Sequence, residues 1–148
     1  MDNTKQDQAQ VSIIIPTYNE SENIIQVLKS IDESIPENIP IEAIVVDDNS
    51  PDGTGKMVED YINDTQNKAG YSINVIHRET KSGLSSAILD GIQHSSGETV
   101  VVMDSDFSHP PKLIPQLIEG IRTANCDIVI ASRYTKGCLL YTSDAADE

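Results

Sequence analysis

Residues Val11–Pro16 read VSIIIP, a run of β-branched side chains closed by a proline. An apolar run without polar alternation is typical of a strand with both faces covered, as in a parallel sheet. Outward from this run, strand-like and helix-like segments alternate. Further strands are expected at Glu42–Asp48, Ser72–Arg78, Glu98–Asp104 and Asp127–Ser132. Five strands separated by helices predict an α/β fold with a mostly parallel central sheet.

The helices between these strands are predicted from apolar residues that recur three and four positions apart. In the first helix, Asn19 and Glu22 have the spacing of a capping box ahead of the stripe that begins at Ile24. Three prolines crowd the segment after the fourth strand, so the next helix is expected to begin near Lys112. The turn-rich segment NSPDGTG, residues Asn49–Gly55, connects the second strand to a short helix.

Charge and composition limit the function classes. The chain has 148 residues, 10 Lys and Arg against 24 Asp and Glu, and a net charge of −14. This balance excludes a nucleic-acid binder, because phosphate neutralisation needs a basic surface. The two cysteines, Cys126 and Cys138, cannot form a disulfide framework, which favours a reducing cytoplasm. No apolar run reaches 18 residues, so neither a secretion signal nor a transmembrane helix is expected.

Two carboxylates after the fourth strand are the sharpest chemical feature. Asp104 and Asp106 lie two positions apart, so in extended chain both side chains point to one side. Two like charges at a strand end call for a counter-charge, and carboxylate oxygens suit Mg²⁺ or Mn²⁺. Ser108 adds a hydroxyl or a water-mediated ligand. The alternative is a solvated acidic turn, because Asp and Ser are common loop residues.

Other polar residues follow the remaining strands at the same edge of the sheet, where ligands bind in open parallel sheets. Asp47 and Asp48 end the second strand, and Asp47 is a candidate acceptor for ring N–H groups of a nucleotide base; the alternative is that both carboxylates cap the turn. Lys81, Gly83 and Arg133 are candidates for meeting phosphate charge, and Arg suits phosphate by paired hydrogen bonds. No GxGxxG follows the first strand and no GxxxxGK[ST] occurs, which removes the main support for a dinucleotide or P-loop site.

Five segments in order resemble glycosyltransferase family 2, of the dolichyl-phosphate (polyprenyl-phosphate) mannosyltransferase type. They are VSIIIPTYNE, IVVDDNSPDGT, RETKSGLSSAI, VVMDSDFSHPPKLIPQLI and IVIASRYTKG, and they span Val11–Gly137. The resemblance implies a GT-A (Rossmann-like) nucleotide-sugar-binding fold. It implies an inverting, metal-dependent transfer of mannose from GDP-mannose to dolichyl (polyprenyl) phosphate. It also implies a cytoplasmic protein, peripheral at the cytosolic membrane face through its lipid acceptor.

The same resemblance assigns roles to residues of this chain. Asp104 and Asp106 bind the metal with Ser108, and Arg133 meets the phosphate charge, so that Asp104, Asp106 and Arg133 carry catalysis. The donor is expected to lie among residues from four strand ends: Pro16, Tyr18, Glu20, Asp47, Asp48, Lys81, Gly83 and Ser105.

The domain expected from these observations is 11–137, preceded by a disordered tail at 1–10. Residues 138–148, CLLYTSDAADE, have neither periodicity nor a cap and resemble translated adapter sequence, so they are expected to be non-native. Members of the family continue past the SRY segment with acceptor-binding basic residues, so the donor-binding domain is expected to be incomplete and acceptor recognition partial.

Three other interpretations remain open. Within the family, the donor is a UDP-sugar such as UDP-glucose. Outside it, DSDFS loosely matches the signature of haloacid-dehalogenase phosphatases, but there the motif ends the first strand. A receiver-like binding module would use Asp47 and Asp48 as an acidic pocket, but the pair falls on the wrong strand for that fold.

Overall fold

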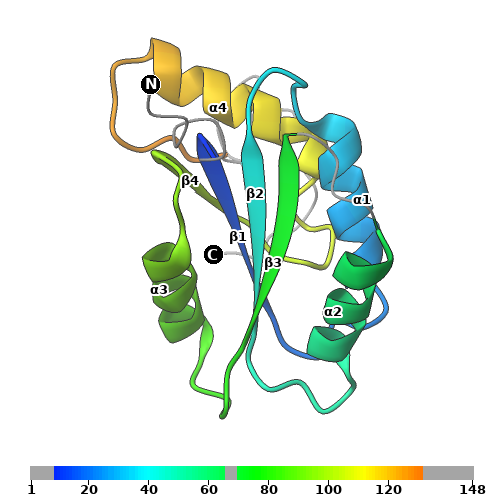
Figure 1. The fold of residues 1–148 in the computed structure, drawn as a ribbon. Coiled ribbons are helices and arrows are strands. Elements are labelled where there is room, and N and C mark those ends of the chain that lie inside the picture. Colours follow the sequence, from blue (N-terminus) through cyan, green and yellow to red (C-terminus); the bar gives the residue numbers. More distant parts are fainter. Residues whose placement is uncertain (1–8, 66–69, 132–148) are drawn as a thin grey trace, which may run out of the picture.

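The computed structural model describes residues 9–65 and 70–131. In this part of the chain a four-stranded sheet forms the centre, in the order β3-β2-β1-β4. Its strands are β1 (Val11–Thr17), β2 (Ile41–Asp47), β3 (Tyr71–His77) and β4 (Thr99–Val102). All neighbouring strands are parallel, which confirms the predicted α/β fold (Figure 1).

Helices cover both faces of the sheet. The helices are α1 (Ile24–Ser34), α2 (Thr54–Asp64), α3 (Leu84–His94) and α4 (Ile114–Thr123), with a 3₁₀ turn, η2 (Pro111–Leu113), leading into α4. In Figure 1, α1 and α2 lie on one side of the sheet and α3 lies on the other. Helix α4 packs with α1, so its buried residues join the core on the α1 side.

The β-branched run of β1 supplies both cores, because successive side chains on a strand point to opposite faces. Ile13 and Ile15 face the larger core beneath α1, α2 and α4. Ile14 faces the smaller core beneath α3, where it joins Ile44 and Val46 of β2. All five side chains are buried. At about 1.5–3 kcal/mol for each buried aliphatic side chain, this run is a main source of stability.

Helix α3 approaches the sheet closely because its facing side chains are small. Ala87 is buried in the smaller core, and a Cβ on Gly91 would lie 2.5 Å from Cγ2 of Ile14 and 3.0 Å from Cγ2 of Val46. No side chain larger than hydrogen fits at this position without moving the helix. This close contact sets the distance between α3 and the sheet.

A buried hydroxyl links β3 to α1. The hydroxyl of Tyr71 donates a hydrogen bond to the carbonyl oxygen of Leu28 at 3.1 Å, and burial raises the pKa of this phenol above its usual range. Replacing Tyr71 by Phe is expected to lower the free energy of unfolding by about 1 kcal/mol, since one net hydrogen bond is lost while the ring stays packed. Urea denaturation measures the difference. The control is Tyr61→Phe, whose ring faces Lys29 across a surface contact; an equal loss in both variants would contradict the role of the Tyr71 hydroxyl.

The fifth predicted strand is wrong for the residues that the structure describes. Residues 127–131 carry the alternation of a strand but make no ladder hydrogen bonds, and Ile128 and Ile130 are 75% and 78% exposed. Val129 lies toward α4, where a Cβ on Gly120 would be 3.4 Å from its Cγ1. A hollow of about 450 Å³ is lined both by this segment and by β4. Strand propensity expresses packing against neighbours, and this segment has no paired neighbour among residues 9–65 and 70–131.

The end of β4 and the start of α1 also differ from the prediction. Strand β4 ends at Val102 rather than Asp104, although the Met103 N–H still donates to the carbonyl of Ile14 at 3.1 Å. The capping box predicted from Asn19 and Glu22 is wrong: α1 begins at Ile24 without a side-chain cap. Asn19 has a φ of 57° and belongs to the preceding loop, because its N–H donates to Ser50 across to the β2 loop.

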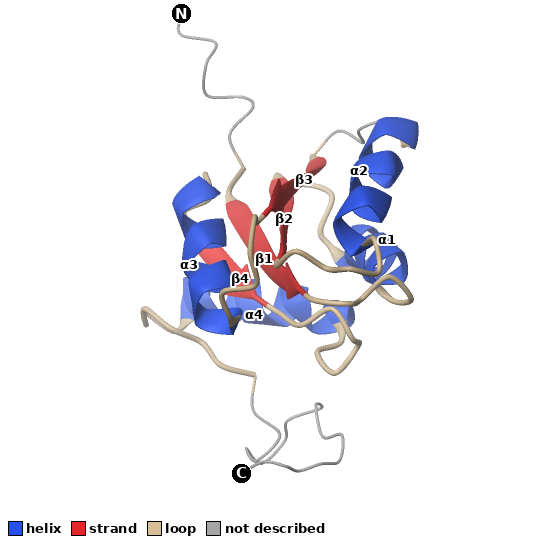
Figure 2. Cartoon of the chain, turned by 90° about the horizontal axis from the view of Figure 1, so that it is seen from below, coloured by secondary structure: helices blue, strands red, loops and turns tan. Residues whose placement is uncertain are grey.

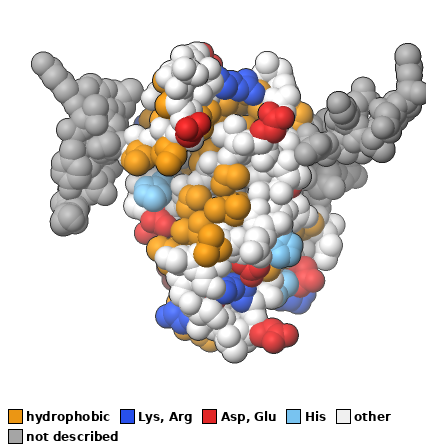
Figure 3. Space-filling model, turned by 90° about the vertical axis from the view of Figure 1, so that its left-hand side faces the viewer, with side chains coloured by type: hydrophobic (Ala, Val, Ile, Leu, Met, Phe, Trp, Pro, Cys, Tyr) orange, Lys and Arg blue, Asp and Glu red, His pale blue; other side chains and the backbone are white. Residues whose placement is uncertain are grey.

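One face of the molecule exposes apolar side chains. Figure 3 shows them gathered on the side of the molecule where α3 and β4 lie. They include Leu89 and Ile92 of α3 and Val100 and Val102 of β4. No helix within the described ranges is long and apolar enough to cross a membrane.

Candidate active site

Four loops meet at the edge of the sheet where the parallel strands end, and Figure 2 looks onto this edge. They are residues 18–23 after β1, 48–53 after β2, 78–83 after β3 and 103–110 after β4. Parallel strands deliver their carboxyl ends to one edge, so these loops carry the residues that the sequence analysis singled out. We call this edge the rim.

Asp47 is held in one orientation at the end of β2. Its carboxylate is 4% exposed and accepts hydrogen bonds from Thr17 Oγ1 at 2.9 Å, Ser50 Oγ at 2.7 Å and Ser50 N at 3.0 Å. Gly55 backs it, since a Cβ there would lie 3.0 Å from Asp47 Oδ2. The Asp47 carboxylate is therefore held in place both by β1, through Thr17, and by its own loop, through Ser50.

The loops after β1 and β2 are joined by backbone-to-side-chain hydrogen bonds. Glu20 N donates to Thr54 Oγ1 at 3.0 Å, and Ser21 N donates to Asp52 Oδ2 at 3.1 Å. Asp52 also accepts from the N–H and hydroxyl of Thr54. Burial alone would raise the pKa of Asp52, but the hydrogen bonds from Thr54 and Ser21 outweigh it and lower the pKa from 3.8 to about 2. The ionised carboxylate therefore stabilises this pair of loops.

This lowered pKa predicts a pH-dependent difference between the protein and its Asp52→Asn variant. A group with a depressed pKa in the folded state adds stability that is present above its unfolded pKa and lost as the pH falls through the folded value. The variant is expected to be less stable at neutral pH, and the difference should narrow as the pH falls from 3.8 toward 2. Urea denaturation across this window measures it. A difference that stays constant with pH would contradict the role of the ionised carboxylate.

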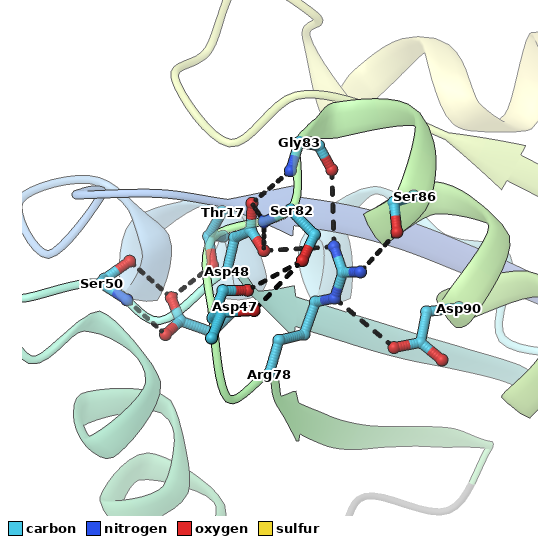
Figure 4. Close-up of polar contacts among 10 residues, drawn as sticks. Thr17, Asp47, Asp48, Ser50, Arg78, Ser82, Gly83, Ser86 and Asp90 are labelled. Atoms are coloured by element: carbon cyan, nitrogen blue, oxygen red, sulfur yellow. Dashed lines mark hydrogen bonds and ion pairs between the residues drawn. The ribbon is translucent and has the colours of Figure 1, made fainter.

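Asp48 faces the opposite direction from Asp47 and binds the loop after β3 (Figure 4). Its carboxylate, 5% exposed, accepts from the backbone N–H groups of Ser82 and Gly83, at 3.0 Å each. It also accepts from Arg78 Nη1 at 3.1 Å, which makes a nearly buried ion pair. The oxygen atoms of Asp48 are therefore occupied by three protein donor groups.

Lys81 lies in the middle of the same loop and reaches the loop after β1. Its ammonium nitrogen is 3.8 Å from the centre of the Tyr18 ring. Such a contact contributes about 0.5–1 kcal/mol at an exposed site, and Tyr18 is 38% exposed. One aromatic face and one positive charge are thus presented together at the rim.

The acidic motif after β4 lies in a loop rather than at the end of an extended strand. Asp106 Oδ1 accepts from Ser108 N at 3.0 Å and from Ser108 Oγ at 2.6 Å. The Ser108 hydroxyl holds the pKa of Asp106 below its usual range. The backbone N–H of Asp104 donates to His109 Nδ1 at 2.9 Å, and His109 Nε2 is 3.8 Å from Asp104 Oδ2. Between the two carboxylates, Ser105 is buried.

The donor atoms of this loop fit a hard divalent cation. Asp106 uses Oδ1 for both of its hydrogen bonds from Ser108, which leaves Oδ2 for a ligand, and the Asp104 side chain is 49% exposed. Within residues 9–65 and 70–131, no group of three His, Cys, Asp or Glu could hold a metal ion alone. Mg²⁺ and related cations bind through one or two carboxylates together with water and phosphate oxygens, so two carboxylates suffice when a diphosphate supplies the remaining ligands.

The structure thus joins Tyr18, Asp47, Asp48, Lys81 and Gly83 through direct contacts between three loops. Pro16 lies in β1 and Glu20 in the first loop, where Glu20 Oε2 accepts from Asn23 at 3.2 Å. The hydrogen bonds of the Asp106 and Ser108 side chains stay inside the fourth loop. Arg133 lies outside the described residues, as do residues 1–8 of the predicted N-terminal tail and the whole segment 138–148.

Sequence reasoning missed several residues that organise the rim, chiefly Arg78, Thr17, Asp52 and Thr54. The role of Arg78 could have been predicted from the sequence. An arginine directly after an apolar strand needs a carboxylate partner if it is buried, and Asp48 at the end of the neighbouring strand is a candidate for that partner. Thr17 carried no signal, because the partner of its hydroxyl, Asp47, lies thirty residues away in sequence.

Comparison with known proteins gives the family. The profile of glycosyl transferase family 2 matches residues 12–144. The dolichol-phosphate mannosyltransferase of Pyrococcus furiosus is 44% identical over 127 residues, covering 86% of this chain and 34% of that protein. The undecaprenyl-phosphate mannosyltransferase of Micrococcus luteus is 41% identical over 130 residues, covering 86% of this chain and 49% of that protein.

A solved structure agrees with the fold. A mannosyltransferase from Pyrobaculum calidifontis, in complex with GDP-Man and Mn²⁺, superposes with a TM-score of 0.57 and is 29% identical. The match covers 67% of this chain and 28% of that one. The chain belongs to glycosyl transferase family 2 and has a GT-A type α/β fold, which confirms the predicted family. It spans between one third and one half of the length of the sequence relatives it matches.

Proposed function

We propose that this chain is the donor-binding part of a polyprenyl-phosphate mannosyltransferase. The observation that carries the proposal is the 44% identity with a dolichol-phosphate mannosyltransferase over 127 residues. The family match at residues 12–144 includes all four rim loops. The donor is GDP-mannose and the acceptor is dolichyl or another polyprenyl phosphate. Because the acceptor is a lipid, the reaction takes place at a membrane surface, on the cytosolic face, with the protein bound peripherally.

The proposed reaction is a single displacement that inverts the anomeric carbon. An oxygen of the acceptor phosphate attacks that carbon, a new carbon–oxygen bond forms, and the bond to the diphosphate breaks with its electron pair leaving on GDP. The acceptor phosphate is already ionised at neutral pH, so no proton has to be removed and no strong general base is required. Catalysis then depends on alignment and on charge placed near the leaving diphosphate.

Each rim loop contributes one part of the donor site. Asp47, which Thr17 and Ser50 hold in place, accepts hydrogen bonds from the base, and Tyr18, whose ring contacts Lys81, binds the nucleoside from the first loop. Lys81 supplies positive charge toward the phosphates. The other donor-binding residues are Pro16, Glu20, Gly83 and Ser105. Asp48 acts indirectly, by holding the loop that carries Gly83. Arg133 is a second phosphate ligand.

Asp104, Asp106 and Ser108 would hold Mg²⁺ or Mn²⁺. When bound, the ion neutralises the charge that develops on the departing diphosphate. The side chains contribute before that step: Ser108 keeps Asp106 ionised, and its contact on Oδ1 leaves Oδ2 directed away from the loop's own hydrogen bonds. The Mn²⁺ in the Pyrobaculum mannosyltransferase complex supports this assignment.

Nucleotide-dependent stabilisation tests the proposal. Thermal unfolding is measured with GDP-mannose, UDP-glucose or acetyl phosphate, each with Mn²⁺ and with EDTA. A ligand that binds only the folded state at ~100 times its Kd stabilises it by about 2.7 kcal/mol, so a clear rise in Tm is expected for GDP-mannose with Mn²⁺.

The other arms separate the alternatives. A rise in Tm with UDP-glucose and none with GDP-mannose would show that the donor is a UDP-sugar. The proposed type of reaction, sugar transfer to a polyprenyl phosphate, would stay the same. A rise with acetyl phosphate alone would favour a receiver-like acidic pocket. If none of the ligands stabilises the chain, the proposed donor site is contradicted.

A further inference from the structure

Arg78, which has no direct part in the proposed reaction, occupies the centre of a polar cluster at the rim (Figure 4). Its side chain is 12% exposed, and each nitrogen has a partner. Nη1 donates to Asp48 Oδ1 at 3.1 Å and to the Gly83 carbonyl at 3.4 Å, and Nη2 donates to the Ser86 hydroxyl. Nε lies 3.6 Å from Asp90 Oδ2. A guanidinium with every nitrogen engaged by the protein is not free to bind a donor.

These contacts hold both ends of the loop that carries Lys81. At its start, the Arg78 N–H donates to the Asp47 carbonyl at 3.0 Å. At its end, the N–H groups of Ser82 and Gly83 donate to Asp48, whose charge Arg78 balances. Gly83 has a φ of 99°, which allows the chain to turn from the loop into α3. Lys81 lies between the two fixed ends.

Asp90 and Ser86 extend the same cluster onto α3. Both lie on the helix that packs closely on the sheet, so the guanidinium connects the end of β2, the loop and α3. Only a planar group with several donors in fixed directions can reach all of these partners at once. Arg78 and Asp48 therefore hold both ends of the loop together.

We infer that Arg78 is a positioning residue, which acts with Asp48 to hold the loop at residues 79–83 so that the Lys81 ammonium is delivered over Tyr18 to the anionic donor. One part of the inference rests on the proposed function, namely that Lys81 binds the anionic donor. The placement of Lys81 over Tyr18 is a property of the protein without ligand. The two parts can therefore be tested separately.

The ligand-free part is tested by NMR. Protons beside the Lys81 ammonium lie over the Tyr18 ring and are expected at upfield shifts because of the ring current. In Arg78→Gln, which removes the charge and leaves a shorter polar side chain, the upfield shift should disappear. Arg78→Lys restores a positive charge near Asp48 and should recover part of it. Arg122→Gln, an exposed arginine on α4, is the matched control and should change nothing. An upfield shift that persists in folded Arg78→Gln would overturn the inference.

The donor part is tested by a double-mutant cycle with GDP and Mn²⁺ in calorimetry. Arg78→Gln and Lys81→Met should each weaken binding roughly ten- to a hundredfold, the range for losing a hydrogen bond from a charged group. The double variant should be no weaker than Lys81→Met alone, because Arg78 acts through Lys81.

Additive losses would overturn that link, since a residue that only stabilises the fold would not couple to Lys81. If the wild-type chain binds neither GDP nor UDP, the proposed function is contradicted. The NMR result then decides the positioning of Lys81 by itself: loss of the upfield shift supports it, and persistence overturns it.

Discussion

Replacing Asp106 by Asn is expected to abolish the Mn²⁺-dependent part of nucleotide binding and leave the fold intact. The substitution removes one of the two carboxylates of the proposed metal site, and a neutral amide is a poor substitute for a hard anionic ligand. The loop should keep its shape, because the amide oxygen can still accept the hydrogen bonds from Ser108 N and Oγ that Asp106 Oδ1 accepts at 3.0 Å and 2.6 Å. We expect at least a tenfold loss of GDP affinity in Mn²⁺, which is about 1.4 kcal/mol.

Calorimetric titration with GDP in Mn²⁺ and in EDTA measures this change. In EDTA the wild type and the variant should bind alike, since the metal contribution is absent from both. Asp64→Asn, at the end of α2, removes an equal charge away from the acidic loop and serves as the control. If Asp106→Asn binds GDP in Mn²⁺ as tightly as the wild type, Asp106 is not a metal ligand.

Replacing Gly97 by Ala is expected to have the largest effect on stability. Gly97 lies in the connection from α3 to β4, where a Cβ would be 2.7 Å from both the N and Oγ of Ser12 and 2.9 Å from the carbonyl carbon of Val11. These atoms belong to β1, a central strand, so they cannot move aside without shifting the sheet. Overpacking of this kind costs about 1–3 kcal/mol.

A buried hydrogen-bond network adds to that cost. Gly97 N donates to Ser12 Oγ at 2.8 Å, and Ser12 Oγ donates to the buried carboxylate of Glu42 at 2.6 Å. Glu42 also accepts from Ser96 N at 2.6 Å. Displacing this connection weakens hydrogen bonds to the buried Glu42 side chain, which costs a further ~1–3 kcal/mol. The total is a large part of the 5–15 kcal/mol typical of a domain.

Urea denaturation of Gly97→Ala and Gly120→Ala tests this expectation with the same chemical change at two sites. Gly120 lies in α4, where a Cβ would meet Val129 Cγ1 at 3.4 Å and the backbone is helical. Alanine should be neutral there or stabilising by up to about 1 kcal/mol. Equal stability of Gly97→Ala and the wild type would show that β1 yields at this contact.

The positions of β1 and β2 could be predicted from the sequence because their β-branched runs leave no amphipathic alternative. The end of β4 could not, since Met103 continues the hydrogen bonding while Asp104 turns into the loop. The strand predicted at Asp127–Ser132 is wrong within the described residues 127–131, because alternation indicates only that a segment can pair. Asn19 looked like a cap, but its N–H is used by Ser50 in another loop, which no local pattern reveals.

The same division applies to the site. Asp104 and Asp106 stood out in the sequence because two like charges at a strand end call for a counter-charge. The different hydrogen-bond partners of Asp47 and Asp48 could not be predicted from the sequence, because both residues are aspartates at the same strand end. One accepts from Thr17 and Ser50, the other from Arg78 and the Ser82 and Gly83 backbone.

By itself the sequence determined where four strands and the helices between them lie, although it also predicted a fifth strand. It also determined the family and the set of polar residues that the strand ends deliver to the rim. Periodicity and strand-end motifs are properties of short segments, so they can be recognised from the amino-acid sequence alone. Only the tertiary structure decided the strand order β3-β2-β1-β4, the partners of each buried carboxylate, and the placement of Lys81 over Tyr18. These depend on hydrogen bonds and packing between segments thirty or more residues apart, which form only once the sheet has brought the segments together.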